Sequence, residues 1–189
     1  AKGAKLILKE SIRVNGNDSN DDNLSGDTTI QEKNITYPTD DKLYKKIIKE
    51  CRKIASEEEI VLRQSYSQTV KKLSTVQRFK KNKNGAKLAR KASKKIKTIA
   101  GVLIRELNRK LTATSVSKHS SNLALFAKVL NQKTHDTNKI YSLHEPHVKC
   151  YTKGKEHKKF EFGSKASFLI TQKTGVIVVT QQSMQHPKI

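Results

Sequence analysis

The chain has 189 residues and a formal net charge of +22, with 39 lysine and arginine residues against 17 acidic ones. This length is enough for one domain with a hydrophobic core, or for one compact part with an appendage. No apolar run is long enough to be a membrane span or a signal peptide, which predicts a soluble, cytoplasmic protein. Cys51 and Cys150 match no metal-ligand spacing and are expected to be reduced thiols.

The excess positive charge is concentrated in the middle of the chain. Residues 60–135 carry 19 lysine and arginine residues and a single acid, Glu106, whereas residues 1–59 carry 11 against 12 and residues 136–189 carry 9 against 4. Such a block binds polyanions, because each neutralised phosphate releases condensed counterions. The alternative is a solvated helix face, and RNA or an anionic membrane surface would satisfy the charge as well as DNA.

The first part, residues 1–38, is predicted to hold the end of a helix, an acidic loop and a strand. Apolar residues at helical spacing place the helix over residues 4–14. The polar segment 15–23 has no glycine or distal glutamate at the offsets that a calcium loop requires, so a solvated acidic loop is expected. The β-branched residues 28–30 predict a strand that carries Asp27, either as an exposed edge residue or as a functional group.

The second part, residues 39–133, is predicted to be a basic helical insertion. Four amphipathic helices are expected, over residues 42–56, 66–81, 86–111 and 117–132. The longest has an apolar stripe at steps of three or four, made of Leu88, Ala92, Ile96, Ile99, Leu103, Leu107 and Leu111. Basic residues fill much of the rest of this helix and form the predicted DNA-binding surface: Lys87, Arg90, Lys91, Lys94, Lys95, Lys97, Arg105 and Arg109.

The third part, residues 134–189, is predicted to be a connector followed by a β-hairpin. Residues 159–170 alternate, Gly175 turns the chain, and residues 176–179 continue as a strand. Together with the Asp27 strand they predict three strands of an antiparallel sheet. One face is expected to be well buried, with Phe160, Phe162, Ala166, Phe168 and Ile170 on it. The segment HEPH at residues 144–147 has the wrong spacing for a zinc helix and contains a proline, so a structural turn is favoured.

Two motifs, in the right order, resemble the catalytic region of bacterial insertion-sequence transposases of the DDE type. The first is GDTTIQEKNITYPTD at residues 26–40, and the second is YSLHEPHV at residues 141–148, followed by KGK at 153–155 and FEFG at 160–163. The resemblance runs from about Lys5 to about Val179. It implies an α/β fold with a partial RNase H-like sheet, made of the Asp27 strand and the C-terminal hairpin, and a large basic helical insertion.

The resemblance also implies a function, DNA transposition by metal-dependent cleavage and transfer of strands at the ends of a double-stranded element. In that family the aspartate that matches Asp27 is the first of three acids that hold Mg²⁺ or Mn²⁺. The second aspartate and the glutamate have no match here, because the residues after Val179 no longer resemble the family. We therefore expect a chain truncated at both ends that retains DNA binding, binds metal weakly or not at all, and is inactive as a nuclease.

Three points stay open at this stage. A small basic nucleic-acid-binding protein, in which Asp27 holds no metal, would share the same composition. A second polypeptide that supplies the missing acids would restore a complete site. Transposases of this kind act as dimers or larger assemblies, so a homo-oligomer is possible, although no residue pattern indicates an interface.

Overall fold

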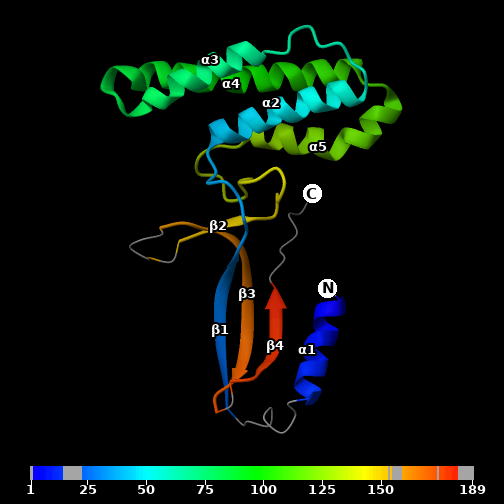
Figure 1. The fold of residues 1–189 in the computed structure, drawn as a ribbon, viewed down its shortest axis with the longest axis vertical. Helices are drawn as coiled ribbons and strands as arrows, with labels where there is room; N and C mark the ends of the chain where they lie inside the picture. Colours follow the sequence, from blue (N-terminus) through cyan, green and yellow to red (C-terminus); the bar gives the residue numbers. More distant parts are fainter. Residues whose placement is uncertain (1, 15–22, 153, 155–158, 174, 183–189) are drawn as a thin grey trace. The chain divides into compact units, whose positions relative to one another are not determined.

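The computed structural model describes residues 2–14, 23–152, 154, 159–173 and 175–182 (Figure 1). The chain divides into two compact units. Residues 1–34 and 147–189 form the first, named the sheet unit, and residues 35–146 form the second, named the helical unit. The chain is a mixed α/β protein in which helix predominates, with an antiparallel sheet. The helical unit covers a wider span than the insertion predicted over residues 39–133.

The sheet unit contains helix α1 (Lys2–Val14) and strands β1 (Leu24–Glu32), β2 (Lys149–Tyr151), β3 (Glu161–Thr171) and β4 (Ile177–Gln182). Strand β3 is central: β1 pairs along one of its edges, while β2 and β4 share the other edge. All of these pairings are antiparallel, so the predicted arrangement of the Asp27 strand and the hairpin is confirmed. Gly175, with φ of 70°, lies in the turn between β3 and β4, where positive φ favours glycine.

The sheet face that was expected to be well buried is only partly covered. The apolar side chains of Phe162, Ala166, Phe168 and Ile170 are half-buried, and Phe160 is 37% exposed. The sheet unit offers little apolar surface to cover them, since within its described residues α1 is the sole helix and its apolar side chains at positions 6 and 7 are exposed. The prediction of a well-buried face is therefore wrong for the described residues.

Gly163 of β3 lies close to the backbone of β1. This residue pairs with Glu32 of β1 and, across its other edge, with Lys149 of β2. A Cβ atom at this position would overlap the carbonyl oxygen of Gln31 and press on the Glu32 backbone. A side chain there would push two paired strands apart, so glycine is required by close approach rather than by a turn.

The helical unit contains α2 (Asp40–Glu57), α3 (Ser67–Arg78), the short 3₁₀ helix η2 (Phe79–Lys81), α4 (Lys83–Lys110) and α5 (Ala113–Asn131). All four predicted helices are confirmed, with ends that differ by a few residues. Thr39 caps α2 by accepting a hydrogen bond from the backbone of Lys42, and Thr112 caps α5 in the same way from Ser115. Side chains of this type satisfy backbone donors that a helix start leaves unpaired.

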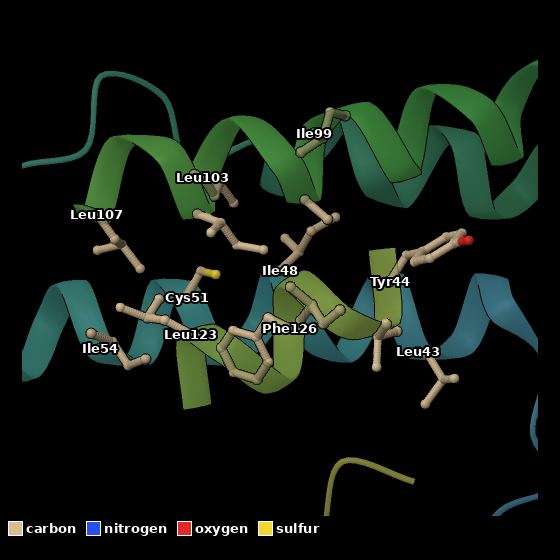
Figure 2. Packing of buried hydrophobic residues seen from close by; sticks show 14 of the residues in the cluster. Leu43, Tyr44, Ile48, Cys51, Ile54, Ile99, Leu103, Leu107, Leu123 and Phe126 are labelled. Carbon is tan, nitrogen blue, oxygen red and sulfur yellow. The ribbon is translucent and has the colours of Figure 1, made fainter. Parts of the chain in front are cut away.

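The core of the helical unit lies where α2, α4 and α5 meet (Figure 2). Leucine, isoleucine, valine and phenylalanine side chains from the three helices interdigitate there, and the fully buried ones include Ile47, Ile96, Leu103, Leu107 and Val129. The predicted apolar stripe of α4 is confirmed from Ala92 to Leu107, whereas Leu111 follows the end of the helix and is only partly buried. The stripe fails at Leu88, which is 58% exposed, because at this end of α4 the neighbouring position Ala89 turns toward the core instead.

Glu58, just after α2, joins that helix to α5. Its carboxylate accepts hydrogen bonds from Lys118 Nζ at 2.7 Å and from the Ser115 hydroxyl, and it contacts His119 Nε2 at 2.9 Å. These hydrogen bonds lower the pKa of the Glu58 carboxyl from 4.5 to about 2, with Lys118 the largest cause. Since the folded protein holds this carboxylate ionised, the contact stabilises the folded state above the ordinary pKa.

A first prediction concerns the β1–β3 junction. Replacing Gly163 by alanine is expected to lower the free energy of unfolding of the sheet by about 2 kcal/mol, because the backbones must separate. Urea denaturation followed by circular dichroism measures this. The matched control is Gly26→Ala in β1, where an added Cβ meets Leu169 at 3.5 Å, an ordinary contact. Equal stability of the two variants would contradict the close approach.

A second prediction concerns pH. The stabilisation from Glu58 should be complete above pH 4.5 and should disappear as the pH falls toward 2, because protonation removes the carboxylate that Lys118 and Ser115 bind. The measurement is the difference in unfolding free energy between the wild type and Glu58→Gln, taken from pH 6 to pH 2.5. A difference that stays constant over this range would show that the carboxylate is not the stabilising group.

Candidate nucleic-acid interface

The eight basic residues predicted to bind DNA all lie on α4, and every one of their side chains is exposed. At 100° per residue, they occupy an arc of about 160° around the helix axis, with Lys97 and Lys95 at its two limits. The buried side chains fill the opposite side. We name these eight residues the α4 basic face: Lys87, Arg90, Lys91, Lys94, Lys95, Lys97, Arg105 and Arg109.

Glu106, the single acid among residues 60–135, lies about 20° beyond Lys95 around the axis of α4, just outside the limit of this face. Its side chain is buried and accepts two hydrogen bonds of 2.7 Å, one from the backbone nitrogen of Arg63 and one from Lys110 Nζ. The Lys110 and Arg63 hydrogen bonds hold the pKa of the Glu106 carboxyl below its ordinary value. Lys110 also donates to the carbonyl oxygen of Val61, so the group fastens the segment after α2 onto α4. The α4 basic face therefore carries no carboxylate of its own.

A pocket of about 470 Å³ opens beside the α4 basic face and shares Lys94 and Lys97 with it. Its walls come from four separate stretches of the helical unit: the start of α2 with the residues before it, η2, the middle of α4, and the connector after α5. We name it the α2–α4 pocket. Its charged side chains are the four lysines and two aspartates Lys80, Lys94, Lys97, Lys139, Asp40 and Asp41.

Several of these pocket side chains are held in place by the fold. Asp40 pairs with Lys139 Nζ at 3.3 Å, and Asp41 accepts a hydrogen bond of 2.9 Å from the Ser93 hydroxyl. The buried amide of Gln132 accepts from the backbone nitrogen of Ile140 and donates to its carbonyl oxygen, which fixes the connector that forms one wall. The pocket is thus built by tertiary contacts rather than by a mobile surface loop.

Tyr44 lies at the inner side of this pocket. Its ring is buried, and Lys97 Nζ lies 5.7 Å from the ring centroid, a cation–π arrangement. Burial, together with the charges of Asp40 and Asp41, raises the pKa of the Tyr44 hydroxyl to about 12. The phenol is therefore neutral at physiological pH. The sequence indicates none of this pocket, because no short-range pattern links residues 44, 80, 97 and 139.

Asp27 lies on β1, the edge strand of the sheet, with an exposed side chain and Phe168 as its cross-strand partner. Within the described ranges, no three histidine, cysteine, aspartate or glutamate side chains gather closely enough to hold a metal ion. A pair of divalent ions needs several carboxylates, so the described residues do not fit the two-metal site of the family that Asp27 resembles. The role of Asp27 as a metal ligand stays a prediction.

The remaining candidate groups have structural explanations. Residues 144–147 form a turn in which the Ser142 hydroxyl accepts from the backbone of Glu145, as the proline predicts. Cys51 and Cys150 are free thiols, and burial raises the pKa of both, that of Cys51 to about 12. A neutral buried thiol is a poor nucleophile.

In the part of the chain that the structure describes, no helix combines the length and apolar character needed to cross a bilayer.

Comparisons of the chain with protein-family models, with curated proteins and with solved structures give no match.

Proposed function

We propose that this chain binds double-stranded DNA through the α4 basic face, and that it is a relative of DDE transposases of insertion sequences. One observation carries the DNA-binding proposal. Eight lysine and arginine side chains lie exposed on one side of a single helix, while the carboxylate of the one acid of the region is buried and accepts hydrogen bonds within the fold. A one-sided positive surface of this kind attracts a polyanion along its whole length.

The dimensions of the face suit a DNA duplex. From Lys87 to Arg109, at 1.5 Å per residue, the face extends over about 33 Å, which is close to one helical turn of DNA. Lysine and flexible arginine side chains on such a rod contact phosphates without reading bases. We therefore propose binding that is largely independent of sequence. The apolar stripe on the opposite side of α4 holds the rod rigidly against α2 and α5.

The catalytic part of the proposal rests on the motif around Asp27 alone. In the intact family, Asp27 would be the first acid of a site that uses Mg²⁺ or Mn²⁺ for strand cleavage and transfer. The chain offers no matching second aspartate or glutamate, so we propose DNA binding without strand cleavage by this chain acting alone. An assembly with further copies, or with a second polypeptide that brings the missing acids, belongs to the same proposal.

The alternative function is that of a small basic nucleic-acid-binding protein in which Asp27 has no metal. The observation that favours it is the position of Asp27 on an exposed edge strand, with no group of three metal-binding side chains among the described residues. DNA binding by the α4 basic face is common to both candidates. The two differ in the role of Asp27 and in the response to divalent metal.

The first test is the salt dependence of duplex binding. If about five side chains contact phosphates, the affinity should fall by roughly 10²- to 10³-fold between 50 and 200 mM salt. Fluorescence anisotropy with a labelled 20-base-pair duplex measures it. The double variant Lys91→Ala/Lys95→Ala should weaken binding about tenfold and reduce the log–log slope by about 2, since two phosphate contacts are lost.

The matched control is Lys46→Ala/Lys49→Ala, which removes two exposed lysines of α2 outside the α4 basic face. Its affinity should stay within about twofold of the wild type. Binding that ignores salt, or equal losses in both double variants, would refute the α4 basic face as the DNA contact.

The second test is strand cleavage and strand transfer on DNA that carries element ends, with Mg²⁺ or Mn²⁺ and with Asp27→Asn as control. We expect no turnover from either protein and equal duplex affinity with and without metal, because one carboxylate does not hold a metal pair. Metal-dependent cleavage that disappears in Asp27→Asn would show that other acids complete the site and would refute the proposal of DNA binding without cleavage.

A further inference from the structure

The α2–α4 pocket has charges that the proposed duplex contact does not use. Its volume of about 470 Å³ falls within the range of small-molecule sites, which run from about 300 to 1,000 Å³. A groove that follows a DNA backbone is elongated, whereas this hollow is bordered by four separate stretches of chain. It therefore fits one small group, such as a single nucleotide, better than a continuous backbone.

The pocket offers positive charge to an anion. Within the described residues, Lys80 and Lys94 form no hydrogen bond or ion pair through their side chains, and both line the pocket. Lys97 adds a third ammonium group above the Tyr44 ring. Lys139, by contrast, is paired with Asp40. Unpaired ammonium groups that converge on a cavity favour a phosphate, to which each makes a charge-assisted hydrogen bond.

The pocket also offers hydrogen-bond acceptors, with which a ligand that is only an anion would form no hydrogen bond. Asp40 and Asp41 line it. Lys139 and Gln132 both contact Oδ1 of Asp40, and Ser93 donates to Asp41, so each carboxylate keeps further acceptor sites. The hydroxyl of Tyr44 is neutral and adds a donor. A ligand with a phosphate at one end and N–H or O–H donors at the other satisfies both sets, and a nucleotide has this composition.

We propose that the α2–α4 pocket binds one nucleotide, with its phosphate on Lys80 and Lys94 and with donors of its base or sugar on Asp40 and Asp41. The inference deepens the proposed function and rests on it, since the pocket shares Lys94 and Lys97 with the α4 basic face. The nucleotide comes either from a phosphorylated strand end of the bound nucleic acid or from the free nucleotide pool. The chemistry of recognition is the same in both cases.

Isothermal titration calorimetry on the full chain tests the pocket, with adenosine 5′-monophosphate as the probe and adenosine as the ligand without phosphate. The nucleotide should bind at least about tenfold more tightly than adenosine. Lys80→Ala/Lys94→Ala should remove that preference. Lys87→Ala/Lys91→Ala, which neutralises two lysines of the α4 basic face outside the pocket, should leave it unchanged. Thermal melting of each variant checks that the helical unit still folds.

A third variant probes the acceptor side. Asp41→Asn keeps the size of the side chain but removes its charge, so it should weaken the nucleotide while leaving inorganic phosphate binding equal or stronger. Loss of both ligands to the same degree would refute the role of Asp41. Nucleotide binding that is absent at millimolar concentration, or that falls equally in the Lys80/Lys94 and Lys87/Lys91 variants, would overturn the pocket proposal.

The source of the nucleotide is identified by comparing the affinity for two 20-base-pair duplexes, one with 5′-phosphate ends and one with 5′-hydroxyl ends. Tighter binding of the phosphorylated duplex, lost in Lys80→Ala/Lys94→Ala, identifies a strand end, whereas equal binding of the two duplexes identifies the free nucleotide. Salt-dependent duplex binding without nucleotide binding refutes the pocket alone. Nucleotide binding without duplex binding refutes the proposed function alone.

Discussion

The helical unit depends on the packing of α4 between its neighbours. One side of this 28-residue helix presents leucine, isoleucine and alanine to α2 and α5, and the burial of that side fixes the rotation of the helix about its own axis. Truncation of a fully buried leucine such as Leu103 or Leu107 costs about 2–5 kcal/mol, a large share of the stability of a domain. Because the rotation is fixed, the lysines and arginines between the apolar positions are held on the solvent side. The core therefore determines where the positive charge lies.

The same packing explains why so few carboxylates balance that charge. Glu106 is buried beside Leu103 and Leu107 of α4. Its carboxylate accepts hydrogen bonds from the backbone nitrogen of Arg63 and from Lys110 Nζ. Glu58, which also belongs to the helical unit, is occupied by Lys118, Ser115 and His119. Acids that would weaken a polyanion site if they faced outward are instead used as internal hydrogen-bond acceptors. The exposed surface of α4 is therefore more positive than the net charge of its sequence, because its one acid is buried.

The elements that follow from local patterns could be predicted, and those that depend on distant partners could not. The helices of the helical unit have apolar residues at 3.6-residue spacing, so their existence followed from the sequence. Strand β2 has three residues and no alternation, and it exists only because β3 pairs with it. The apolar spacing placed Leu88 on the predicted stripe, but in the structure Ala89 is buried and Leu88 is exposed. The pocket joins residues far apart in the chain, such as Lys80 and Lys139, so no sequence pattern marks it.

The pairing of β1 with β3 has a consequence for the order of events during synthesis. Asp27 of β1 can pair with Phe168 of β3 only after the whole helical unit has been synthesised, since residues 35–146 lie between the two strands. The helical unit, by contrast, packs helices that all lie within residues 40–131. While the ribosome is completing that unit, β1 has both edges open and its backbone groups unpaired, which is the condition in which strands associate with other chains. The helical unit that carries the positive charge thus also delays closure of the sheet.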